Sequence, residues 1–427
     1  MGIKVKYYYS ACVGITTPDV SILCDPWFTD GIYDGSWYQF PKFDNPLDKV
    51  GKYDLIYISH IHPDHYDPIF LRKYLEKYPD TKIVARETFL KRAILSEGFK
   101  LYNEEYKFNE TEFEIFFNDT ESTSDIDTAL VVKWRDESIV NMNDNAYNEE
   151  QISEIKKFLS TKSISQYENF QELEYVYNRP SIALLGYTGA GPYPQTYYAD
   201  EKTLIELANH KKQEFFRRYK DMDKALNAKI NIPFAGQYIL GGKFTHLNQY
   251  RGIADAIEVL DFDRKATVLQ ECAELEVGGN ATSKRYKPYK EMDLRLKEIE
   301  NELMDYEKLD ISLNKIPFMR LLNIAYERAI SLSEYTGSDY MLVIKSFKGY
   351  YVCNLKLMSS KPCLIQELSE LPDLPRLIIE TDPRHLFGLL TGLYHWNNAI
   401  VGSHLTAIRQ PDIFNREVDR FLNFFHI

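Results

Sequence analysis

The sequence predicts an α/β fold, because short apolar runs of the strand type alternate with stretches whose apolar residues recur at helical spacing. The run YDLIYIS at 53–59 is short and apolar on both faces, as a strand in the centre of a sheet is. It is followed by the helical pattern PIFLRKYLEKYP at 68–79, the strand TKIVA at 81–85 and the helical pattern ETFLKRAILSEGF at 87–99. These stretches form one αβ repeat.

The rest of the first 250 residues continues the alternation. Two more strand-like runs come before YDLIYIS, and a loop rich in Gly, Asp and aromatic residues lies at 29–43. Residues 112–144 return to strands, and the run SIALLGY leads into the Gly- and Pro-rich loop at 186–198. The stretches 149–160 and 199–228 predict helices, and INIPFAGQYILGG predicts one more strand and loop.

The sequence changes character near residue 280. Residues 285–309 form a charged span with a helical pattern, which we interpret as a solvated connecting helix. Residues 310–427 carry further helical runs, a hairpin-like SDYMLVIKSFKGYYVCNLKL and a helical tail. We therefore expect a metal-binding catalytic domain at 1–284, followed by a helical linker and an α/β accessory module at 285–427.

Composition narrows the class of partner and the compartment. The 427-residue chain has a net charge of −12 and a pI near 5.4, which argues against nucleic acid or an anionic membrane surface as partner. Its five cysteines are scattered and form no CxxC pair, so a reduced, cytoplasmic protein is expected. No apolar run reaches the roughly 18 residues that a membrane span needs. A small-molecule substrate is the remaining expectation.

The motif SHIHPDHYD at 59–67 predicts a metal site. It places His60, His62 and His65 within six positions, with Asp64 beside the last, on the loop that leaves a predicted buried strand. Neutral imidazole and carboxylate are common ligands of zinc and iron. In such a loop, residues 60 and 62 can turn to one metal while 64 and 65 turn to a neighbouring one, and two ions suit hydrolysis.

Three segments together give a resemblance to a known family. DPW at 25–27, SHIHPDH at 59–65 and NMND at 141–144 resemble the metallo-β-lactamase fold superfamily. The resemblance implies an αββα sandwich with a dinuclear metal site at one sheet edge. It implies that the first metal is bound by His60 and His62, the second by Asp64 and His65, that Asp144 bridges them, and that Asp25 supports a ligand from behind.

Within that superfamily the chain is most similar to the metallo-β-lactamase-like part of CMP-N-acetylneuraminate hydroxylases. The likeness rests on DLIYISHIHPDH, on DIDTALVV followed by SIVNMND, on GYTGAGPYPQTY and on IPFAGQY, which together span about residues 20–250. Those hydroxylases hold a Rieske cluster, and the chain has no Cys-x-His box for one.

Two departures from the superfamily pattern concern the ligands. Thr123 stands near the place of the usual third histidine, so Asp125 or Asp127 is the substitute; Asp125 is preferred, because Asp127 also suits the capping of a turn. Gly242 aligns with the last histidine ligand, and His246 either reaches back to the metal or is structural. An added carboxylate would favour iron or manganese over zinc.

Four further residues are candidates for substrate contact. Tyr187 and Gly189 lie in the loop at 186–198, where a plain turn is the alternative reading. Trp37, in the aromatic loop, offers a stacking platform for a sugar or base, with core packing as the alternative. Arg251 suits a phosphate or carboxylate, with surface pairing as the alternative.

We expect a metal-dependent hydrolase, in which a metal-bound hydroxide attacks a phosphoester or acyl group of a small anionic substrate, such as a nucleotide-linked sugar. Asp64 would also hold or accept the proton of the attacking water. One alternative is an iron- and dioxygen-dependent hydroxylase that needs a separate electron donor. The other is a non-catalytic binding protein with a degenerate metal site. Covering the pocket and forming a homodimer are the roles considered for the C-terminal module.

Overall fold

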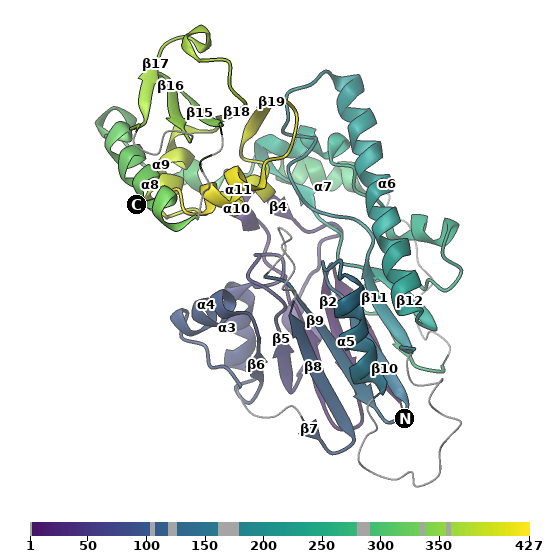
Figure 1. Cartoon of the computed structure of the whole chain (residues 1–427). Helices are drawn as coiled ribbons and strands as arrows, with labels where there is room; N and C mark the ends of the chain where they lie inside the picture. Colours follow the sequence, from purple (N-terminus) through teal and green to yellow (C-terminus); the bar gives the residue numbers. More distant parts are fainter. Residues whose placement is uncertain are drawn as a thin grey trace.

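The computed structural model describes residues 2–102, 107–117, 126–160, 179–279, 291–333, 337, 339–355 and 360–427. The described residues up to residue 279 contain two six-stranded sheets stacked face to face (Figure 1). The first sheet has the order β14-β1-β2-β3-β5-β6. Its strands are β1 (Lys4–Tyr9), β2 (Cys12–Thr16), β3 (Ser21–Cys24), β5 (Leu55–Tyr57), β6 (Lys82–Val84) and β14 (Glu274–Glu276).

The second sheet has the order β12-β11-β10-β9-β8-β7. Its strands are β7 (Lys107–Phe108), β8 (Thr111–Phe117), β9 (Thr128–Trp134), β10 (Glu137–Asn141), β11 (Ile182–Gly186) and β12 (Ile230–Phe234). Side chains alternate between its faces. On β9, Leu130 and Val132 enter the core between the sheets, whereas Ala129 and Val131 face outward to a separate helix-covered core.

Helices cover the outer faces of both sheets. The helices α3 (Pro68–Lys77) and α4 (Thr88–Ser96) pack on the first sheet, where Leu71 and Leu90 join Ile56 of β5 in one buried cluster. The helices α5 (Glu149–Ser160) and α6 (Glu201–Leu226) cover the second sheet through Ile155 and Phe216. The predicted α/β class and the αββα sandwich are therefore confirmed.

The carboxyl ends of the parallel strands meet at one edge of the sandwich. The strand β5 is parallel to β3 and β6, and β10, β11 and β12 are parallel to one another. Asp25 therefore follows β3, the loop 59–65 follows β5, and Asp144 follows β10 at the same edge. Asp127 also lies there, because it precedes β9, which runs antiparallel to β10.

The C-terminal residues form a second α/β body with the five-stranded sheet β17-β16-β15-β18-β19 (Figure 1). Its strands are β15 (Met341–Ser346), β16 (Gly349–Asn354), β17 (Cys363–Ile365), β18 (Arg376–Glu380) and β19 (Thr406–Gln410). Its helices are α8 (Phe318–Leu332), α9 (Pro383–Thr391), α10 (Trp396–Val401) and α11 (Arg416–Asn423). The predicted boundary at residue 285 lies outside the described residues.

The span 285–309 is helical over a shorter length than its pattern predicts. Within the described part, α7 (Met292–Ile299) is followed by the short 3-10 helix η3 (Asp305–Lys308). Arg295 of α7 is largely buried and pairs with Asp30, so this helix is docked on the aromatic loop rather than free in solvent.

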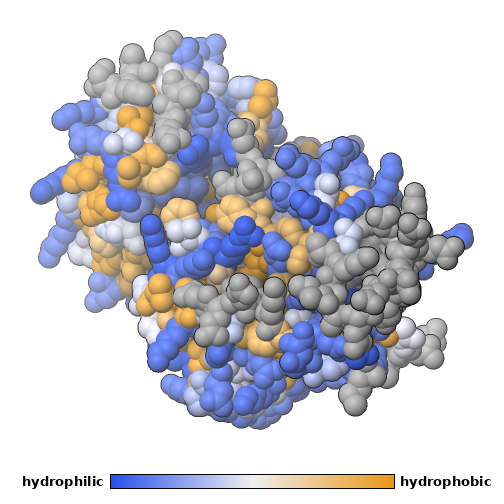
Figure 2. Space-filling model, turned by 60° about the horizontal axis from the view of Figure 1, so that its bottom comes forward, coloured by the Kyte–Doolittle hydropathy of each residue, from blue (hydrophilic) through white to orange (hydrophobic). Residues whose placement is uncertain are grey.

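The aromatic loop at 29–43 contains α1 (Ile32–Gly35) and the strand β4 (Trp37–Tyr38), which pairs with β13 (Ile239–Leu240), and α2 (Pro46–Val50) follows the loop. The 3-10 helices η1 (Gly242–Tyr250) and η2 (Ala256–Asp261) follow β13. On the face drawn in Figure 2 hydrophilic side chains predominate and apolar ones form separate small patches. Among the described residues, no helix combines the length and apolarity that crossing a membrane requires.

Candidate metal centre

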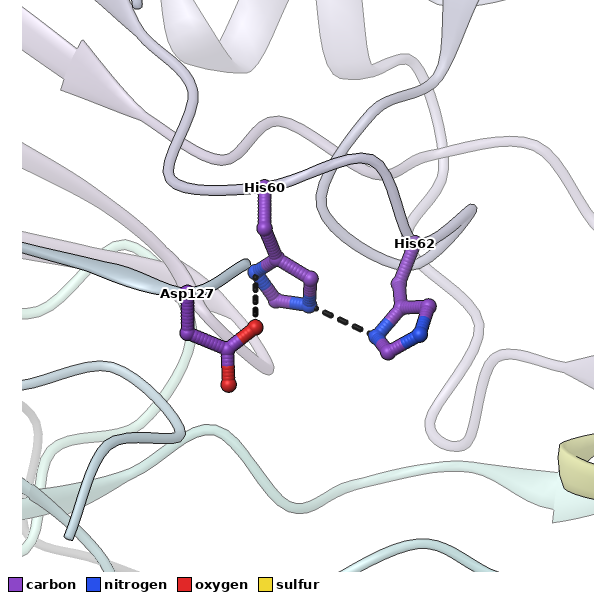
Figure 3. A group of neighbouring side chains, drawn as sticks. All are labelled: His60, His62 and Asp127. Carbon is purple, nitrogen blue, oxygen red and sulfur yellow. Dashed lines mark hydrogen bonds and ion pairs between the residues drawn. The ribbon is translucent and has the colours of Figure 1, made fainter. Parts of the chain in front are cut away.

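His60 and His62 face each other across a short gap (Figure 3). Nε2 of His60 lies 2.8 Å from Nδ1 of His62. On the other side of its ring, Nδ1 of His60 lies 2.9 Å from Oγ of Ser59 and 3.5 Å from Oδ1 of Asp127. Burial lowers the pKa of both histidines, so both are neutral imidazoles with a lone pair to offer at neutral pH.

His65 is surrounded by carboxylates. Its Nδ1 lies 3.2 Å from Oδ2 of Asp25, and its Nε2 lies 3.4 Å from Oδ2 of Asp144 and 3.5 Å from Oδ2 of Asp64. Burial by itself would lower the pKa of His65, but the three negative charges raise it well above its ordinary value. In the absence of a metal ion this ring is therefore a cation, and it must release a proton to become a ligand.

Asp25 holds the start of the histidine loop. Its Oδ1 accepts a hydrogen bond of 2.7 Å from the backbone N–H of Ser59, and its other oxygen faces His65. The side chain is fully buried, and the backbone has a φ of 43°, in the left-handed region that few residues other than Gly adopt. Such strain is typical of positions that a functional site fixes.

The donor set suits a divalent cation. Two groups of three residues offer ligand atoms that, within each group, lie within 4.8 Å of one another. His60 belongs to both groups: the first adds His62 and Asp127, and the second adds His65 and Asp144. Burial, followed by the negative charge of Asp144, raises the pKa of Asp127 well above its ordinary value, and its Oδ1 is buried without a hydrogen bond. A cation would relieve this crowding of carboxylates.

The remaining predicted ligands lie differently. Asp125 and Thr123 are outside the described residues, so the preference for Asp125 stays a prediction, whereas Asp127 contacts His60. His246 lies exposed on η1 and belongs to neither ligand group among the described residues. Sequence reasoning gave Asp127 the competing role of a turn cap, because an acidic residue just before a strand often caps a turn.

Three of the predicted substrate residues are packed into the protein. Trp37 is 1% exposed and stacks on Tyr238 with ring centres 3.4 Å apart, and Tyr187 is equally buried. Gly189 lies against Phe215 of α6, where an added Cβ would come within 2.0 Å of the ring. For Trp37 the stacking and burial match the core-packing alternative. Arg251 is buried at 4% exposure rather than paired on the surface.

Two supporting residues were missed by sequence reasoning. The hydroxyl of Tyr33, in α1, donates a hydrogen bond of 2.5 Å to Oδ1 of Asp64. Asn397, at the start of α10, has its Oδ1 3.0 Å from Nε2 of His62. The Nε2 of His404 lies 2.7 Å from the backbone oxygen of Tyr33, so the C-terminal body supports the site twice.

A cleft of about 720 Å³ adjoins the histidine loop. Its wall includes Ile61 and Pro63 of that loop, Tyr33 of the aromatic loop, Arg295 of α7 and Asn398 of α10. The C-terminal body therefore lines part of the cleft beside the histidine loop.

Comparisons with known proteins agree with this geometry. Residues 4–150 match the model of the "Beta-lactamase superfamily domain". The chain is 26% identical over 240 residues to a "Putative Rieske 2Fe-2S iron-sulfur protein" of Mycolicibacterium smegmatis, covering 51% of this chain and 40% of that protein. It is 32% identical over 105 residues to the cytidine monophosphate-N-acetylneuraminic acid hydroxylase of Asterias rubens, covering 24% of this chain and 16% of that protein.

Among solved structures, a "possible metal-dependent hydrolase" from Veillonella parvula is similar over 65% of this chain and 100% of its own, at 12% identity and a TM-score of 0.44. The chain spans less than half the length of the two curated relatives named above. The fold, the clustered histidines and aspartates and the matched domain agree on a metal-dependent protein with one or two divalent ions. Residues 4–150 thus match the beta-lactamase superfamily domain, and part of the chain is similar to a cytidine monophosphate-N-acetylneuraminic acid hydroxylase.

Proposed function

We propose that the protein is a metal-dependent hydrolase acting on a phosphoester or acyl group of a small anionic substrate, a nucleotide-linked sugar being one candidate. The observation that carries the proposal is the pair of ligand groups that share His60, because two neighbouring ions suit hydrolysis. When bound, one or two divalent ions supply an activated water and polarise the group that it attacks.

The residues of this chain have separable roles in that reaction. His60 and His62 offer facing nitrogens to one ion, with Asp127 as a further donor or as the group that holds the outer nitrogen of His60. His65 and Asp144 lie together for a second ion. Asp25 orients the His65 ring through its other nitrogen.

Asp64 is the candidate proton acceptor. Its Oδ1 is engaged by the Tyr33 hydroxyl, whereas its Oδ2 faces His65 at 3.5 Å. The Tyr33 hydrogen bond thus fixes the carboxylate while leaving the second oxygen toward the ligands. From that position Asp64 holds the attacking water or takes its proton.

An iron- and dioxygen-dependent hydroxylase, with a separate electron donor, is the second candidate. Four carboxylates, Asp25, Asp64, Asp127 and Asp144, surround three histidines, and an oxygen-rich donor set favours iron or manganese over zinc. Relatives that bear hydroxylase names favour the same chemistry. Hydrolysis comes first because metal and water suffice for it.

The test is an anaerobic assay of the purified protein against phosphomonoesters, phosphodiesters and acylated or nucleotide-linked sugars. Turnover that is lost in a His60→Ala, His62→Ala variant and kept in His210→Ala supports hydrolysis, because His210 is an exposed histidine on α6. Product that appears only with dioxygen and a reductant would replace hydrolysis by the hydroxylase. A protein that takes up no metal would be a binding protein.

A further inference from the structure

Arg251 is a buried cation without a carboxylate partner. Its guanidinium donates a hydrogen bond of 2.8 Å to the backbone oxygen of Tyr238 and lies 4.3 Å above the ring of the same residue. Its Nε is buried and makes no hydrogen bond. Within the described ranges no Asp or Glu oxygen comes within 4.0 Å of this side chain.

Lys211 is a half-buried basic residue near Arg251. It lies on α6, and its Nζ donates to the backbone oxygen of Gly191 at 3.3 Å. Burial and the positive charge of Arg251 lower the pKa of Lys211 to about 7. Among the residues that the structure describes, no ion pair is formed by Lys211, whereas Lys212, next to it on the helix, pairs with Glu258 at 2.9 Å.

The backbone brings the two cations together. Gly252, which follows Arg251, has a φ of 67° and lies so close to α6 that a Cβ would meet the backbone oxygen of Ala208 at 2.3 Å. This contact sets the residue after Arg251 against Ala208, which lies about one helical turn before Lys211 on α6. The loop 186–198 closes the other side, because Gly191 accepts from Lys211 and Gly189 packs on α6.

Two neighbouring basic side chains without a carboxylate partner are costly to keep charged away from water, and the lowered pKa of Lys211 reflects this cost. An anionic ligand would supply the missing negative charge and favour the protonated form of Lys211. Arg offers a planar fork suited to carboxylate and phosphate, and Lys adds a compact point charge.

The pair adjoins the metal centre through a stack of rings. Tyr238 lies between Arg251 on one face and Trp37 on the other, and Trp37 contacts the ring of Tyr33 with centres 4.5 Å apart. Tyr33 in turn donates to Asp64. This series of contacts links Arg251 to the side chains of the histidine loop.

We propose that Arg251 and Lys211 form an oxyanion-binding site that holds a phosphate or carboxylate group of the substrate beside the metal centre. That the bound anion belongs to a substrate rests on the proposed function, whereas anion binding by Arg251 and Lys211 does not require a metal ion. The cleft at Arg295 has a different lining, with five acidic against three basic side chains, and does not suit an anion.

The experiment is calorimetric titration of the full-length protein with inorganic phosphate and, separately, with acetate. Titrations use the His60→Ala, His62→Ala variant beside chelator-treated wild type, so that no bound ion captures the anion. Lys211→Met is expected to weaken binding at least about tenfold, since it removes a charged hydrogen-bond donor. Arg251→Lys keeps the charge but loses the fork, and is expected to weaken binding to a similar degree.

Arg217→Met is the matched control, because Arg217 is an exposed cation on the same helix, paired with Glu214 at 2.7 Å. Binding that survives loss of the metal ligands and falls only in the Lys211 and Arg251 variants supports the site, and preference for phosphate or acetate identifies the group. Absence of binding in the chelator-treated wild type, equal weakening by Arg217→Met, or full binding by Lys211→Met would overturn it. Failure of the hydrolase proposal alone would leave these titrations unchanged.

Discussion

Asn397 connects the C-terminal body to the metal centre, and replacing it by Ala tests that connection. Its side-chain oxygen lies 3.0 Å from Nε2 of His62 and accepts a hydrogen bond when Nε2 carries the ring proton. In that tautomer Nδ1 of His62 keeps its lone pair, which faces His60. Removing a partner of this kind behind a ligand typically weakens metal affinity about 10- to 100-fold, or about 1.4–2.7 kcal/mol. Asn397→Ala is therefore expected to weaken metal binding by that factor.

The assay is competition for zinc or manganese against a chelator of known affinity, with the free energy of unfolding measured in parallel. Asn398→Ala is the matched control, since its side chain lines the cleft and contacts no histidine ligand in the described structure. Asn397→Asp should retain affinity, because a carboxylate accepts the same hydrogen bond. Wild-type affinity in Asn397→Ala would refute the role of the C-terminal body in orienting His62.

Three further changes test other contacts. Tyr33→Phe removes the hydroxyl that fixes Asp64, and should lower kcat about tenfold or more without changing the metal content measured by elemental analysis. Asp127→Asn removes a buried carboxyl whose raised pKa makes the folded state take up a proton that the unfolded state releases at pH 7, so the metal-free protein should become more stable to denaturant at pH 7 while its metal affinity falls. Burial raises the pKa of Asp419 from 3.8 to about 6, so the folded state holds its proton more tightly than the unfolded state does. The free energy of unfolding should therefore fall by about 3 kcal/mol as pH rises from about 3 to 7, with about 2 kcal/mol of the fall between pH 4 and 6, and urea titrations should find this fall reduced in Asp419→Asn.

Sequence reasoning succeeded where neighbours in the chain are neighbours in space. The strand ending at Tyr57 and the loop that follows it place His60, His62 and His65 together, so their clustering could be inferred from spacing. The α/β class followed from periodicity for the same reason. Inferring the ligand set required one long-range assumption, namely that Asp144 and this loop lie at the same edge of the sandwich. The parallel pairing of the strands that precede them places both there.

The rest depends on contacts between distant segments. Asn397 is 335 residues from His62, and nothing in its local sequence distinguishes it from Asn398. The helical pattern at 285–309 misled because apolar spacing cannot reveal where a chain leaves the helix to dock: α7 ends at Ile299, and η3 then packs near α9. Lys211 sits in a charged helix face, and only the close approach of Gly252 to α6 brings Arg251 near it.

Metal content tests the central claim most directly. The protein is purified anaerobically and analysed for bound elements beside the His60→Ala, His62→Ala variant and the His210→Ala control. One or two equivalents of zinc, iron or manganese in the wild type and the control, with loss in the double variant, is the predicted result. No stoichiometric metal in any of the three proteins, even after reconstitution, would contradict it.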